Sequence, residues 1–159
     1  MHRLFCALSI LALAACGGVE TENDASVGQA EAPASFEASV TDAFVMAPLE
    51  GRDLSMGGAT ITVTGADARL VGASAAFAET IELHTMAMED GTMRMRQVEG
   101  YDVAVGETLE LKRGGNHFMI FGVEELVVGD TQPLLLQFEL EDGSIVETEV
   151  AATVRGLGE

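Results

Sequence analysis

The chain has 159 residues, with 26 acidic and 8 basic side chains and a formal net charge of −18 at pH 7. This length leaves room for one ordinary domain and little else. So large an acidic excess disfavours nucleic acid and anionic lipid headgroups as partners. Acidity of this kind is first a solubility property, so we assign no ligand role to any individual carboxylate.

Residues 1–15 have the pattern of a bacterial lipoprotein signal peptide. His2 and Arg3 precede an apolar run over residues 4–13, and the letters LAAC end the pattern at Cys16. The run is shorter than a membrane-spanning helix, which needs about 20 residues. We predict that residues 1–15 are removed and that Cys16 is lipidated. The lipid would anchor the chain to a bacterial membrane, which could be the outer membrane. An ordinary secretory signal cut nearby is the alternative.

Residues 16–38 are predicted to form a flexible acidic tether. They contain no Lys, Arg or His and many small residues, a composition typical of disordered linkers. A coil of about 20 residues spans roughly 25 Å, enough to hold the following domain, expected over residues 39–155, clear of the membrane surface. With Cys6 in the signal peptide and Cys16 lipidated, that domain contains no cysteine, and it therefore has neither a disulfide nor a thiolate site.

The rest of the chain consists of short β-like segments separated by turn residues. Asp90-Gly91 predicts a two-residue hairpin turn, and we also interpret Gly57-Gly58 and Gly114-Gly115 as turns. Many short strands without a convincing long helix indicate an all-β fold, an antiparallel β-sandwich. Strands are expected over residues 40–46, 59–64, 68–73, 79–88, 92–98, 108–112, 132–140 and 144–152, with one more around His117. The candidate core residues are Leu70, Phe77, Ile81, Leu83, Leu109, Leu111, Phe118, Ile120, Leu134, Leu136, Phe138 and Leu140.

Histidine and methionine recur together between residues 84 and 119, in a region that holds two of the three histidines of the chain. His84 and Met86 lie on the same face of their strand because strand side chains alternate. A two-residue turn would place Met86 opposite Met95 on the neighbouring strand. His117 and Met119 are also two positions apart and leave their strand on one side. Three segments distant in sequence could therefore meet in one small site.

Thioether and imidazole groups are neutral ligands that suit Cu(I) much better than Ca²⁺, Mg²⁺ or Mn²⁺. The sequence thus predicts a copper site. The alternative is that these side chains only pack, because methionine is a common filler of hydrophobic cores. Met88 and Met93 are interpreted as surface or lid residues, and Met46 and Met56 are too far away in sequence to be placed.

The spacing His84, ten residues, Met95, twenty-one residues, His117, one residue, Met119 resembles the H-x10-M-x21-H-x-M signature of the periplasmic PCuAC-type copper chaperones. The flanking residues are similar as well, including ELHTM before the hairpin and DGTMRMR across its turn, and the likeness covers roughly residues 44–150. The resemblance implies a Greek-key, cupredoxin-like fold. It also implies that these four residues bind Cu(I). Met86 lies outside the signature, and we predict it as an auxiliary or exchange ligand because it lies near the site.

The function implied by the resemblance is that of a carrier with no reaction of its own. It would hold copper in the periplasm and supply it for assembly of the copper centres of cytochrome c oxidase, through the copper-site subunit or a Sco-like thiol protein. Two alternatives remain open at this point. One is a copper scavenger with the same site, and the other is a structural surface sandwich without metal. The sequence contains no nucleophile elbow of the Gly-x-Ser-x-Gly type, the motif that would indicate a hydrolase.

Overall fold

The computed structural model describes residues 35–158, and within this range every regular element is a β-strand. The predictions for the signal peptide, for Cys16 and for most of the tether fall outside the described residues. No helix long and apolar enough to cross a membrane occurs among residues 35–158. The strands are β1 (Glu37–Met46), β2 (Leu54–Thr64), β3 (Ala68–Ser74), β4 (Thr80–Glu89), β5 (Thr92–Val98), β6 (Tyr101–Val103), β7 (Thr108–Leu111), β8 (His117–Phe121), β9 (Thr131–Leu140) and β10 (Ile145–Arg155).

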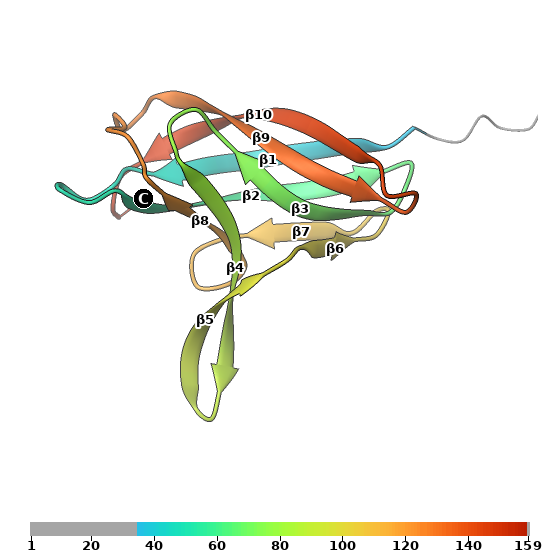
Figure 1. Ribbon diagram of the computed structural model, residues 1–159, viewed down its shortest axis with the longest axis horizontal. Helices are drawn as coiled ribbons and strands as arrows, with labels where there is room; N and C mark the ends of the chain where they lie inside the picture. Colours follow the sequence, from blue (N-terminus) through green and yellow to red (C-terminus); the bar gives the residue numbers. More distant parts are fainter. Residues whose placement is uncertain (1–34, 159) are drawn as a thin grey trace, which may run out of the picture. The chain divides into compact units, whose positions relative to one another are not determined.

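The strands form one sheet with the order β5-β4-β8-β2-β1-β10-β9-β3-β6, and β7 pairs with β2 beside β8. All pairings are antiparallel except that of β1 with β10, which is parallel. Strands β3 and β4 are far apart in this order and yet contact each other, as do β6 and β7. The sheet therefore folds over on itself and encloses a core (Figure 1). The predicted all-β, largely antiparallel architecture is confirmed.

Alternating apolar side chains from both layers fill the core. On β8, Phe118 and Ile120 are fully buried, whereas the next residue in each direction faces the other side of the strand. Of the twelve predicted core residues, Ile81, Leu109 and Leu140 are only partly buried, and the other nine are buried. Four buried valines were not among the predicted core residues, namely Val45 of β1, Val63 of β2, Val103 of the short strand β6 and Val154 of β10.

The hairpin of β4 and β5 extends away from the other strands (Figure 1). Its turn is Asp90-Gly91, as predicted, and both residues have positive φ, 48° and 80°. This is the backbone of the two-residue turns that match the twist of a hairpin. The register that follows from it pairs Met86 with Met95. β5 is an edge strand, and most of its side chains are exposed.

The interpretation of Gly57-Gly58 as a turn is wrong. Both glycines lie inside β2, where Gly57 pairs with Phe118 of β8 and Gly58 pairs with Phe44 of β1. A Cβ atom on Gly58 would come within 2.1 Å of the Leu111 carbonyl oxygen, and one on Gly57 within 2.8 Å of the Phe44 carbonyl oxygen. These glycines permit neighbouring backbones to approach closely. By contrast, Gly114 has a φ of 80° and lies in a turn, as expected.

Candidate metal centre

Three adjacent strands bring the predicted histidines and methionines to one face of the sheet. β4 lies between β5 and β8, and His84 on β4 is the register partner of His117 on β8. Met95 on β5 pairs with Met86, which lies two residues after His84 on the same face. Met119 follows His117 on that face as well. The convergence expected from the sequence is therefore present in the backbone register.

The imidazole of His117 is held by a backbone contact, and its free edge faces sulfur. Its Nδ1 lies 2.9 Å from the carbonyl oxygen of Gly115. Because a carbonyl can only accept, Nδ1 carries the proton, and a neutral ring then has its lone pair on Nε2. This Nε2 is 3.2 Å from the Sδ atom of Met95. His117 is buried, with 4% of its surface exposed, so its ring is fixed by the fold.

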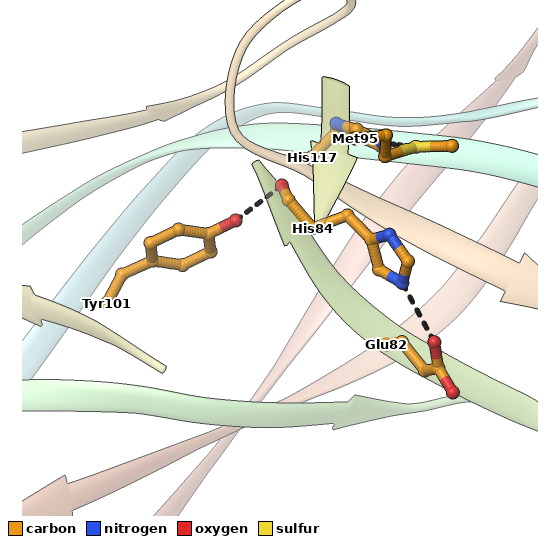
Figure 2. A network of polar contacts seen from close by, with 5 residues as sticks. All are labelled: Glu82, His84, Met95, Tyr101 and His117. Atoms are coloured by element: carbon orange, nitrogen blue, oxygen red, sulfur yellow. Dashed lines mark hydrogen bonds and ion pairs between the residues drawn. The ribbon is translucent and has the colours of Figure 1, made fainter. Parts of the chain in front are cut away.

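In His84 the ring nitrogen available to a metal is Nδ1, whereas in His117 it is Nε2. Its Nε2 lies 2.8 Å from Oε2 of Glu82, and its Nδ1 is buried without a hydrogen-bond partner. The ring centroids of His84 and His117 are 5.9 Å apart. Figure 2 shows the ring of His84 between Glu82 and the side of the site where His117 and Met95 lie. A carboxylate that accepts the proton of Nε2 leaves the lone pair on Nδ1, which is the arrangement common for metal-binding histidines.

Met95, His117 and Met119 also line a cavity of about 310 Å³. His84 does not belong to this lining and adjoins the cavity only through its neighbour His117. Two further methionines line it, Met46 from β1 and Met56 from β2. Met56 is the register partner of Met119. Sequence reasoning could not place these two methionines, because only the pairing of β1, β2 and β8 brings them here.

Besides Met46 and Met56, the carboxylate of Glu82 is a feature of the site that was not predicted from the sequence. Glu82 and His84 are two residues apart on a strand, and this spacing alone indicates a common face. A further support comes from Tyr101, whose hydroxyl donates to the carbonyl oxygen of His84 at 2.5 Å. Burial raises the pKa of Tyr101 to about 12, and a backbone contact with His117 lowers it in part. The hydroxyl therefore stays protonated at physiological pH and fixes the backbone of β4.

The donor set fits a soft monovalent metal ion better than a hard divalent one. No group of three or more His, Cys, Asp or Glu side chains suited to a metal occurs within residues 35–158. On this face, the Nδ1 of His84, which lacks a hydrogen-bond partner, and the Nε2 of His117 are candidate imidazole donors. Met95 and Met119 are the candidate thioether donors. This combination of donors favours Cu(I).

A model of the LpqE-like family, described as "Putative lipoprotein LpqE-like", matches residues 38–152. The chain belongs to the LpqE-like family. Among its relatives is "Putative lipoprotein Lxx21020" of Leifsonia xyli subsp. xyli, which is 32% identical over 107 residues. That match covers 66% of this chain and 63% of the relative, so the chain spans less than two thirds of the relative's length.

Solved PCuAC domains share the fold of this LpqE-like chain. The copper-bound PCuAC domain from PmoF2 has a TM-score of 0.60 at 17% identity, over 75% of this chain and 92% of that domain. CuI-DR1885 from Deinococcus radiodurans has a TM-score of 0.57 at 28% identity, over 84% of this chain and 85% of that protein. Apo-DR1885 matches 96% of this chain with a TM-score of 0.55. The predicted relationship to PCuAC domains is confirmed.

Proposed function

We propose that this chain is a copper chaperone, which binds one Cu(I) through His84, Met95, His117 and Met119 and passes it to another protein. The observation that carries the proposal is the contact between Nε2 of His117 and Sδ of Met95 at 3.2 Å. Two lone-pair donors face each other there with no proton between them, and a cation bound by both lone pairs would stabilise this arrangement. The copper-bound PmoF2 domain and CuI-DR1885 support the choice of metal, since both have similar folds.

The site is suited to transfer as well as to binding. Met95 is 47% exposed on the projecting edge strand β5, so an incoming ligand can reach the metal from the hairpin side. Four neutral ligands hold Cu(I) without compensating its charge, whereas a thiolate acceptor would hold it more tightly. Met86 pairs with Met95 across the hairpin, and in this proposal it occupies a vacated coordination position during exchange.

We further propose that lipidated Cys16 anchors the domain to the bacterial membrane on the periplasmic side. From there it would deliver Cu(I) for assembly of the copper centres of cytochrome c oxidase, to the copper-site subunit or to a Sco-like thiol protein. The lipoprotein pattern of residues 1–16 and membership of a lipoprotein family support the anchor. The chain itself catalyses no reaction in this proposal.

A transfer experiment tests the proposal. The whole chain, loaded with one equivalent of Cu(I) under anaerobic conditions, is mixed with a reduced apo acceptor that contains a Cys-based copper site. NMR signals of both proteins report where the copper resides. We expect transfer within minutes, and we expect Met86→Leu to slow transfer more than it weakens binding. If copper stays on this chain, the chain is a copper scavenger and the chaperone proposal is wrong. If the chain binds no Cu(I), the remaining interpretation is a structural β-sandwich without metal.

A further inference from the structure

One face of the β4–β5 hairpin carries four methionines in two cross-strand pairs. Met86 pairs with Met95, and Met88 pairs with Met93 next to the turn. Strand side chains alternate, so residues two apart on each strand share a face, and both pairs lie on the face that carries His84. We call Met86 and Met95 the inner pair, because they adjoin the candidate copper site, which we call the inner site. Met88 and Met93 are the outer pair, which lies nearer the hairpin tip.

Hairpin geometry brings the two members of each pair close together. In a two-residue hairpin the residues that flank the turn, here Glu89 and Thr92, form the hydrogen-bonded pair, and pairs then alternate along the ladder. Both methionine pairs fall at the non-hydrogen-bonded positions, where opposing side chains are closest, with Cβ atoms about 4.5–5.5 Å apart. Successive pairs on one face are separated by about 7 Å, twice the rise of a strand residue.

Packing does not account for the outer pair. Met88 is 65% exposed and Met93 is 46% exposed, so neither belongs to the core. The opposite face of the hairpin is polar, because Arg94 and Arg96 form ion pairs there with Glu89. The two faces therefore differ sharply, with thioethers on one and charges on the other, and only the thioether face leads to the candidate copper site.

We infer that Met88 and Met93 form an outer Cu(I) site at the hairpin tip, and that copper passes between this pair and the inner site through Met86 and Met95. This inference rests on the proposed function. Each step exchanges one thioether for another, and copper remains Cu(I) throughout, so no electron or proton is transferred. Two exposed thioethers bind more weakly than the inner ligand set, which makes the outer pair a point of entry and exit.

The test uses the whole chain with methionine methyl groups labelled with ¹³C, titrated anaerobically with Cu(I). We expect the first equivalent to shift the methyl signals of Met95 and Met119, and an excess to shift those of Met88 and Met93. The double variant Met88→Leu with Met93→Leu should keep the affinity for the first Cu(I) and release it several-fold more slowly to a reduced thiol-containing acceptor. The matched control is Arg94→Lys with Arg96→Lys, which alters the opposite face of the same hairpin and should release copper at the wild-type rate.

The outcomes separate the two proposals. If the double variant releases copper as fast as the wild type while the inner site binds normally, the outer pair has no role in transfer. Methyl signals of Met88 and Met93 that do not move with excess Cu(I) would overturn the outer site in the same way. If the wild-type chain binds no Cu(I) at all, the proposed function itself falls.

Discussion

The Nε2 atom of His117 lies 3.2 Å from the Sδ atom of Met95, although 22 positions and an intervening strand separate the two residues. Neighbouring strands are about 4.8 Å apart, so the backbones of β5 and β8 are separated by about twice that distance. The side chains of Met95 and His117 extend toward each other over β4 and together span this gap. The inner site therefore depends on the projecting hairpin as well as on the rigid body of the domain.

Replacing Met95 by Leu should weaken Cu(I) binding without unfolding the protein. Met95 is 47% exposed, so the fold loses little packing, whereas one of the two proposed thioether ligands is lost. We expect the affinity to fall at least about tenfold, which corresponds to about 1.4 kcal/mol. Competition against a Cu(I) chelator measures this loss.

Met93→Leu is the matched control, because Met93 lies on the same strand and face and is 46% exposed. It should leave the affinity for the first Cu(I) nearly unchanged. Equal losses in the Met93 and Met95 variants would mean that the hairpin contributes no specific ligand.

Glu82 is expected to act through His84. Glu82→Leu removes the acceptor of the Nε2 proton, which frees the ring to change tautomer and orientation. Loss of such a partner lowers metal affinity by about 10- to 100-fold in known sites, and Glu82→Gln, which keeps an acceptor oxygen, should lose less. ¹⁵N NMR of the apo protein should show the Nε2-protonated tautomer of His84 in the wild type. A variant with unchanged tautomer and unchanged affinity would show that Glu82 merely forms a surface contact.

Acidification should weaken Cu(I) binding. An imidazole must be neutral to bind metal, whereas a thioether binds no proton near neutral pH. Protons therefore compete with copper at His84 and His117 when the pH is lowered, for example in an experiment that runs from about 7.5 to about 5. Chelator competition over this interval should show a steady loss of affinity. A flat profile would indicate that neither histidine is a ligand.

Tyr101 should make the fold sensitive to alkaline pH. Its pKa is raised from 10.0 to about 12 by burial, so the unfolded chain loses the phenolic proton at lower pH than the native chain. Its contribution to stability is constant below pH 10 and is lost between about pH 10 and 12, by up to about 2 kcal/mol. Tyr101 is the single tyrosine of the chain, so its phenolate absorbance reports the titration directly. Tyr101→Phe should lose less stability over this interval, and equal losses would show that Tyr101 titrates alike in both states.

Local patterns were enough to predict the hairpin and the histidine face. The turn at Asp90-Gly91 fixes the register of β4 against β5, and side-chain alternation then orders the residues on each strand. Similarly, Phe118 and Ile120 are buried because they alternate with His117 and Met119. These features depend on neighbours in sequence.

Non-local pairing accounts for what the sequence did not reveal. Gly57 and Gly58 have the sequence pattern of a turn. In the structure they lie in a strand, where the backbone oxygens of Phe44 and Leu111 leave no room for a Cβ atom. Met46 and Met56 reach the cavity because β2 pairs with both β1 and β8. No local signal encodes which strands become neighbours, so neither the glycine role nor the two extra methionines could be derived from spacing.

The most direct test of the copper site is X-ray absorption at the copper edge, measured on the whole chain loaded with one equivalent of Cu(I). We expect a mixed coordination shell in which both sulfur and nitrogen scatter. The sulfur contribution should be reduced in Met95→Leu and Met119→Leu, and the nitrogen contribution should be reduced in variants of His84 and His117. A shell of nitrogen and oxygen alone, unchanged by loss of either methionine, would contradict it.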